Sequence, residues 1–232
     1  MGTLFVVATP IGNLEDTSLR AIRILREADR ILCEDTRVTR KLLSHFQIDK
    51  PLLSYHQHSR IERLDDIVEY LRQGEKIALV SDAGTPGISD PGNVLVEYVN
   101  RKLGSAVRIE AVPGASALTV AASASGLPTD RFTFLGFLPH KKGRETLFRR
   151  IAESEETVIF YESPHRFMKT LDSLGEMLAP DRIVFVAREL TKKFEECWRG
   201  PIAECRKYFQ AQPDHVRGEF VVVVSGITYI QP

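Results

Sequence analysis

Short runs of β-branched and aromatic residues alternate in this chain with stretches whose apolar residues recur at helical spacing. The run TLFVVA (3–8) predicts a strand, and in the following stretch, 17–29, Leu19, Ile22, Leu25 and Ala28 recur at helical spacing. RILCE (30–34) and KIALVS (76–81) predict further strands, and further helices are expected at 36–46, 61–73 and 93–102. This order predicts an α/β fold with a mostly parallel sheet covered by helices on both faces.

The sequence pattern changes after VRIEAVPGASA (107–117). The stretch ASALTVAASASGL (115–127) predicts a helix of small residues, which Gly126 and Pro128 end. Strand patterns at 131–138, 157–162, 182–189 and 218–226 follow, with a basic helical stretch at 140–150 and a helix at 164–178. We therefore expect two α/β domains, residues 1–114 and residues 115–232.

The charge and cysteine content exclude several classes of protein. Lys plus Arg and Asp plus Glu both number 31, so a polyanionic partner would have to be held by a local patch. The three cysteines form no CxxC pair, which argues against a disulfide framework or a zinc ribbon and favours a reducing cytosol. No apolar run approaches the ~20 residues of a membrane span. We expect a cytoplasmic protein without a membrane anchor.

The segment LVSDAGTPGISDPG (79–92) concentrates conformational constraint after a strand. Its three glycines allow a close approach of backbone to a ligand, and Pro86 and Pro91 hold the path rigid. Ligands of open α/β sheets bind outside the carboxyl ends of strands, so this segment predicts a ligand loop in which Asp82 and Asp90 offer carboxylates. An ordinary strand-to-helix connection capped by Asp90 is the alternative.

Other strand-end segments also change abruptly to Pro, Gly, Ser and charged residues, namely VATPIGNLED (7–16), AVPGASA (111–117), FYESPHR (160–166) and ARELTKKFEE (187–196). Several such loops at one site favour a ligand cleft over a purely structural role. No GxGxxG follows the first strand and no GxxxxGK[ST] is present. His56 and His58 have no third ligand nearby in sequence, so no metal site is predicted.

These segments, together with EDTRVTRKLL (34–43), the long run 111–139 and GEFVVVV (218–224), resemble the ribosomal RNA small subunit methyltransferase I family. This family is the RNA 2'-O-methyltransferase branch of the tetrapyrrole methylase superfamily. The resemblance implies two domains of the tetrapyrrole methylase type, the second with a mixed sheet, and S-adenosylmethionine in the cleft between them. It also implies 2'-O-methylation of a cytidine ribose in small-subunit (16S) rRNA by a homodimer. Two differences from the family, Ser59 after the His-x-His motif and an end at Pro232, bear on RNA docking.

The resemblance assigns cofactor contacts to three loops of the first domain and to strand ends of the second. The residues are Pro10, Gly12, Asp82, Ala83, Gly84, Thr85, Ile88, Asp90, Pro113, Gly114, Ala115, Ser116, Ala117, Phe137, Leu138 and Tyr161.

Methyl transfer to a ribose hydroxyl requires alignment and late removal of one proton. Candidate bases or orienting groups follow strands of the second domain: Glu162, His165 and Glu189, with Glu219 as a further candidate. Glu162 comes directly after an apolar strand and before Pro164, which predicts a partly buried carboxylate that projects at the cleft. Each of these groups is also compatible with a cap or a salt bridge.

RNA contact would depend on two basic patches. Arg37, Arg40 and Lys41 fall on one face of a predicted helix, and Lys141, Lys142 and Arg144 lie in the basic stretch 140–150. Solvated helix faces are the alternative for both patches. Two other functions stay open: methylation of a small molecule or protein, and a nucleotide-binding module without catalysis. A steep loss of substrate binding with salt would separate RNA from a small neutral substrate.

Overall fold

A computed structural model of the chain describes residues 1–55 and 61–230. The chain divides into two compact units, Met1–Ser116 and Ala117–Pro232. The division falls two residues beyond the expected one, after residue 116 and not 114. The Thr85 hydroxyl donates to the Ala115 carbonyl over 3.1 Å, which ties this end segment to the first unit. His56, His58 and Ser59 lie outside the described residues.

The first unit is a parallel sheet with the strand order β3-β2-β4-β1-β5. The strands are β1 (Gly2–Val7), β2 (Arg30–Cys33), β3 (Leu52–Ser54), β4 (Lys76–Val80) and β5 (Val107–Val112). Four helices connect them: α1 (Leu19–Glu27), α2 (Thr36–His45), α3 (Ile61–Arg72) and α4 (Gly92–Leu103). The predicted parallel α/β architecture is confirmed.

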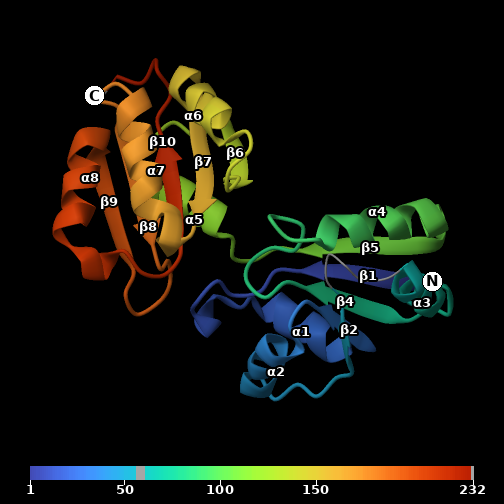
Figure 1. The fold of residues 1–232 in the computed structure, drawn as a ribbon. Coiled ribbons are helices and arrows are strands. Elements are labelled where there is room, and N and C mark those ends of the chain that lie inside the picture. The colour runs from blue at the N-terminus through green and yellow to red at the C-terminus, as the bar shows by residue number, and fades with distance from the viewer. Residues whose placement is uncertain (56–60, 231–232) are drawn as a thin grey trace. The chain divides into compact units, whose positions relative to one another are not determined.

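Two apolar cores lie on opposite faces of this sheet. Phe5, Val7 and Ala78 pack under α1 and α2, whereas Leu4 and Leu79 pack under α3 and α4 (Figure 1). The neighbouring strands β1 and β4 therefore continue into helices on opposite faces. In open α/β sheets, the carboxyl ends of two such strands form a crevice that holds ligands.

The second unit has a mixed sheet with the order β6-β7-β10-β8-β9. β6 and β7 pair in parallel, and all the other neighbours pair antiparallel. The strands are β6 (Phe132–Phe137), β7 (Thr157–Glu162), β8 (Ile183–Arg188), β9 (Glu196–Pro201) and β10 (Phe220–Val224). The helices are α5 (Ala117–Ser125), α6 (Arg144–Glu153), α7 (Pro164–Met177) and α8 (Ile202–Ala211). Helices α6, α7 and α8 share one core on this sheet, and α5 contacts β7, β8 and β10 (Figure 1).

The register of this sheet brings several strand ends to one edge. Phe220 at the start of β10 lies opposite both Glu162, the last residue of β7, and Arg188, the last residue of β8. The parallel neighbour β6 ends beside them, where Phe137 pairs with Tyr161. The candidate residues of the second unit therefore extend from a common edge of its sheet.

Candidate functional site

The loops after β1 and β4 are fixed to each other at the carboxyl edge of the first sheet. The N–H of Thr9 donates to the Gly84 carbonyl over 2.9 Å, and the N–H of Gly84 donates back over 3.1 Å. The buried Thr9 hydroxyl also donates to the Ser81 carbonyl over 3.1 Å. Thr9 and Ser81 were not predicted as site residues, although both lie at strand ends beside loop residues that were. The two loops form one rigid unit.

Glycine is required at two points of this edge. Gly84 has φ +81°, and a Cβ there would lie 3.3 Å from Ile11 Cγ2 and 3.6 Å from the Ala115 carbonyl oxygen. A Cβ at Gly114 would lie 2.9 Å from the Ala8 Cβ. The loops after β1, β4 and β5 therefore pack closely against one another at these two glycines, and ligand binding at this edge stays a prediction.

Asp90 shapes the second half of the loop after β4. Its Oδ1 accepts the N–H groups of Gly87 and of Gly92, each over 2.7 Å. Helix α4 begins at Gly92 after the N-cap residue Pro91, so Asp90 is not the N-cap itself, but its carboxylate accepts the first N–H of the helix, in keeping with the alternative of a capped strand-to-helix connection. Ile88 is 40% exposed at the tip of this loop. A contact of Asp90 with the cofactor stays a prediction.

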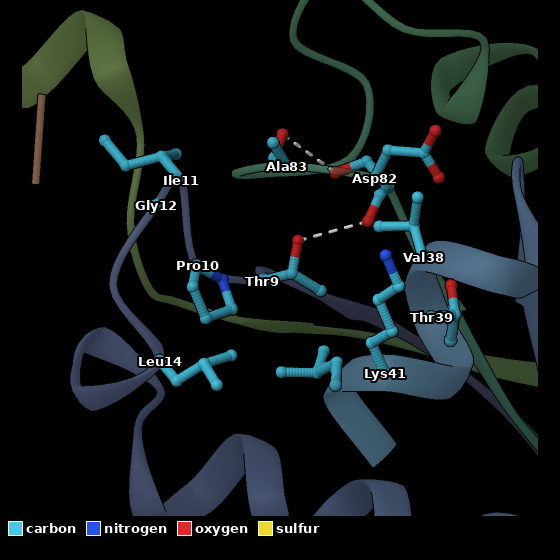
Figure 2. A pocket seen from close by; sticks show the side chains of 12 residues that line it. Thr9, Pro10, Ile11, Gly12, Leu14, Val38, Thr39, Lys41, Asp82 and Ala83 are labelled. Atoms are coloured by element: carbon cyan, nitrogen blue, oxygen red, sulfur yellow. Dashed lines mark hydrogen bonds between the residues drawn. The ribbon is translucent and has the colours of Figure 1, made fainter. Parts of the chain in front are cut away.

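A pocket of about 270 Å³ opens between the loop after β1, the loop after β4 and α2 (Figure 2). Its lining includes the predicted residues Pro10, Gly12, Asp82 and Ala83. Helix α2 adds Val38, Thr39, Lys41 and Leu42, and the Lys41 side chain extends from the helix toward the loop after β4 (Figure 2). Val38, Thr39 and Leu42 were not predicted as site residues, because their positions in the helical pattern are those of ordinary core and surface residues.

Negative charge collects at the rim of this edge. Asp82 is exposed, and its Oδ1 accepts the N–H of Asp35 over 3.0 Å. Burial raises the pKa of Glu34, the residue after β2, and the charges of Asp90 and Asp82 raise it further. The charges of Glu34, Asp82 and Asp90 therefore repel one another, and a cation would relieve this repulsion where an anion would add to it.

In the second unit, the end of β6 packs around Tyr161. The Tyr161 ring makes edge contacts with Phe134 and Phe137, and its hydroxyl accepts the N–H of Leu118 over 3.1 Å. Ala117 begins α5 one residue before this contact. Phe137 is 56% exposed, but Leu138 is 1% exposed and belongs to the core under α6 and α7. The Leu138 side chain is therefore core, and a contact of this residue with the cofactor stays a prediction.

Glu162 is fully buried, which corrects the expectation of a partly exposed carboxylate. Oε1 accepts from the Arg166 guanidinium over 2.7 Å and from the Ser163 N–H over 2.9 Å. Oε2 accepts from the Thr170 hydroxyl over 2.7 Å and from the Arg144 guanidinium over 3.2 Å. Both oxygens are engaged within the fold, so this geometry favours a positioning role over proton transfer. Of these partners, the sequence indicated Arg166, which lies four residues after Glu162, but gave no sign of Arg144 or Thr170.

The same contacts engage the Arg144 side chain within the second unit, so a contact of Arg144 with RNA stays a prediction. Its side chain is 11% exposed, and it also donates to the Pro139 carbonyl over 3.0 Å. Helix α6 begins at Arg144, so Lys141 and Lys142 lie in the turn before the helix and are exposed. The expected basic helix over 140–150 is therefore a turn followed by a helix, and only the turn presents free lysines.

The other candidate bases lie at the same sheet edge. Glu189 Oε1 accepts from the Lys192 ammonium and from the Glu219 N–H, both over 2.9 Å. Burial raises the pKa of Glu189, but these two donors outweigh burial and bring that pKa below its ordinary value. The mostly exposed Glu219 pairs with Lys192 over 2.8 Å. His165 is exposed in the first turn of α7. Of the candidates Glu162, His165 and Glu189, only His165 is exposed.

The basic residues of α2 line a second, wider depression beside the pocket. Arg37, Arg40, Lys41 and His45 line it, and its volume is about 670 Å³. The Arg37 guanidinium pairs with the Asp35 carboxylate over 2.6 Å, and this contact lowers the pKa of Asp35 to about 2. Arg40 and Lys41 are the more available cations of this patch.

No group of His, Cys, Asp or Glu side chains within residues 1–55 and 61–230 could hold a metal ion. Of the helices in that part of the chain, none has both the length and the apolar character that a membrane span needs.

Comparison with known proteins shows where the chain belongs. A family model of the tetrapyrrole (corrin/porphyrin) methylases matches residues 3–206. A Synechocystis protein named ribosomal RNA small subunit methyltransferase I is 48% identical over 98% of this chain and 80% of its own length. A Thermotoga maritima protein of the same name is 45% identical over 97% of this chain and 99% of its own length.

Two solved structures share the fold at low sequence identity. The methyltransferase CobJ matches with a TM-score of 0.71 at 22% identity, over 100% of this chain and 97% of that one. A uroporphyrin-III-C-methyltransferase from Thermus thermophilus matches with a TM-score of 0.64 at 18% identity, over 97% of this chain and 94% of that one. With the two α/β units described above, these matches show that the chain belongs to the tetrapyrrole methylase family, in the ribosomal RNA small subunit methyltransferase I branch.

Proposed function

We propose that this protein uses S-adenosylmethionine to methylate the 2'-oxygen of a cytidine ribose in small-subunit rRNA. The observation that carries the proposal is the rigid edge formed by the loops after β1, β4 and β5. The chain that forms this edge is 48% identical to a protein named ribosomal RNA small subunit methyltransferase I. A cytoplasmic homodimer is part of the proposal.

The residues at this edge fit the cofactor. S-adenosylmethionine carries a sulfonium whose methyl group is the electrophile of the reaction. The carboxylates of Glu34, Asp82 and Asp90 favour a cation there, and the glycines at 84 and 114 leave the backbone accessible. Pro10, Gly12 and Ala83 line the adjoining pocket. That the cofactor lies in a cleft between the domains stays a prediction.

The acceptor ribose requires alignment and one proton acceptor. Because Glu162 and Glu189 are engaged within the second unit, His165 is the group that we propose for the proton, since an exposed imidazole is the commonest general base. Arg40, Lys41, Lys141 and Lys142 would contact phosphates as exposed cations.

The decisive experiment is methyl transfer from labelled S-adenosylmethionine to small ribosomal subunits, followed by mapping of the labelled nucleotide. A 2'-O-methyl group removes the hydroxyl that alkaline cleavage of RNA needs, so the modified position should resist alkali. Label on a base, or at a nucleotide other than cytidine, would contradict the proposed reaction. Transfer to a small molecule or a protein, with none to RNA, would favour the alternative class of methylase.

The cofactor site has a matched pair of test variants. Gly84 and Gly74 both have positive φ, +81° and +93°, but a Cβ at Gly74 has no neighbour within 4 Å. Ala at either position costs about 1–2 kcal/mol of backbone strain. We expect Gly84→Ala to weaken S-adenosylmethionine binding in calorimetry and Gly74→Ala to leave it unchanged. If the two folded variants bound S-adenosylmethionine with equal affinity, the loop after β4 would not be the cofactor site.

A further inference from the structure

The connection between β8 and β9 has an unusual backbone for its sequence. Glu189 has φ +50° and Thr191 has φ +65°, although neither is glycine. Side chains with a Cβ rarely adopt this left-handed region, and such residues persist where the surroundings hold them in place. Residues 189–195, which we call the β8–β9 loop, are therefore held in a conformation that the chain would not adopt unaided.

Charged side chains hold this loop against the start of β10. The Lys192 ammonium donates to Glu189 Oε1 over 2.9 Å and to Glu219 Oε2 over 2.8 Å. The Glu189 N–H donates to the Glu219 carbonyl over 2.9 Å, and the Thr191 N–H donates to the Glu195 carboxylate. Gly218 leaves the space that the Glu189 side chain needs, since a Cβ there would lie 2.3 Å from Glu189 Oε1. The loop is preorganised before any partner binds.

This preorganised loop exposes an aromatic ring. Phe194 is 63% exposed, more than any other phenylalanine in the described part of the chain. The Lys193 ammonium lies 5.6 Å from the centre of the Phe194 ring, and Lys193 itself is exposed. An exposed ring beside a cation matches the two parts of a nucleotide, since a base stacks on the ring and a phosphate pairs with the ammonium.

We propose that Phe194 is a stacking platform for an unpaired base of the RNA substrate, with Lys193 contacting a neighbouring phosphate. The loop leaves the same end of the sheet at which β7 ends in Tyr161 and Glu162, and it contains the candidate residue Glu189. Single-stranded RNA is bound by stacking of this kind, because every base offers a flat face. The proposal rests on the proposed function in requiring an RNA substrate.

The test compares three replacements of Phe194 in binding to small ribosomal subunits. Phe194→Ala should weaken binding by roughly 5- to 150-fold, the contribution of one stacked base. Phe194→Leu should lose a similar amount, because it keeps apolar area without a flat ring. Phe194→Trp should retain binding, and its fluorescence should be quenched by the subunits beyond the change in wild type, whose single tryptophan is Trp198. Leu19→Ala, at an 85% exposed apolar residue, is the control and should bind like wild type.

Several results would overturn the platform. If Phe194→Ala bound small subunits with wild-type affinity, base stacking on Phe194 would be excluded. If Phe194→Leu bound them with wild-type affinity, the contact would be apolar without stacking. A change in oligomeric state of Phe194→Ala, measured by sedimentation, would place the ring between copies of this chain. If the wild-type protein methylates RNA and Phe194→Ala binds it equally well, only the platform fails. If the wild-type protein neither binds nor methylates RNA, the proposed function fails with it.

Discussion

Replacing Glu162 by Gln tests whether this carboxylate stabilises the second unit or takes part in proton transfer. The carboxylate is fully buried between the guanidinium groups of Arg144 and Arg166, which are 11% and 17% exposed. Gln retains the shape but removes the negative charge. Its amide N–H₂ would also face a guanidinium from either side-chain orientation, so two donors would meet without an acceptor.

The size of the expected destabilisation follows from the burial of Glu162, Arg144 and Arg166. Breaking a buried ion pair by removing one partner costs about 3–5 kcal/mol, because the remaining charge stays buried and unpaired. A matched control lies on α6, where Glu145 pairs with Arg149 and the two side chains are 68% and 67% exposed. An exposed helical pair of this spacing contributes about 0.3–0.5 kcal/mol. We therefore expect Glu162→Gln to destabilise the second unit several times more than Glu145→Gln does.

Urea unfolding followed by tryptophan fluorescence measures this difference, because the single tryptophan, Trp198, lies in the second unit. A double variant with Arg144→Met should lose less than the sum of the two single variants, which would show direct coupling between the side chains. The reasoning fails if Glu162→Gln unfolds at the urea concentration of the control. If that stable variant had also lost methyl transfer, Glu162 would be restored as the candidate base.

The remaining predictions concern RNA contact, thiol reactivity and acid stability. Joint replacement of Lys141 and Lys142 by Ala should weaken binding of the small subunit and reduce the salt slope by up to about 2, and an unchanged slope would show that these lysines do not contact phosphates. Iodoacetamide should label only the exposed Cys197, because Cys33 and Cys205 are buried and out of reach of the reagent; peptide mass spectrometry of the labelled folded protein checks this, and a label on Cys33 or Cys205 would contradict it. Since the folded pKa of Glu189 is below its ordinary 4.5, its ionised form adds stability that is lost as pH falls below about 4.5, so Glu189→Gln should show a smaller drop in Tm on acidification, and an equal drop would refute the effect.

Most elements that carry a long periodic pattern were predicted from the sequence, whereas α8 (Ile202–Ala211) and the short or irregular strands were not. The helix at α1 was predicted from Leu19, Ile22, Leu25 and Ala28, of which Leu25 and Ala28 are buried. Leu19 is 85% exposed, and Ala21 and Ile24 complete the buried face in its place. Strand β3 has three residues, too few to show alternation. Strand β9 has the sequence ECWRGP, whose Gly, Pro and charged residues are typical of a loop, so it was not predicted. β9 forms only because it pairs with β8 along its whole length.

The residues of the candidate site likewise divide into those that a local sequence pattern predicts and those that it does not. Loops rich in Gly and Pro can be recognised because the backbone requirement is local, and the positive φ of Gly84 and the close approach at Gly114 match that pattern. Charged residues cannot be assigned locally. Glu162 and Arg144 were given separate roles, as a base and as a phosphate contact, yet they pair across 18 positions of sequence. The same holds for Glu189 and Glu219, which Lys192 joins across a strand end.

The engagement of Glu162 and Glu189 is compatible with methyl transfer, because a sulfonium methyl group demands alignment more than acid–base chemistry. Correct orientation of two reactants supplies about 7–11 kcal/mol of barrier reduction, whereas a general base supplies about 10²- to 10⁴-fold, or about 3–5 kcal/mol. Rigid loops therefore contribute the larger share in the proposed reaction. Thr9, Gly84 and Asp90 fix the loops of the first sheet, and Lys192 fixes the loop after β8. Charged and polar groups that hold backbone in place would then affect the transfer rate without touching the proton.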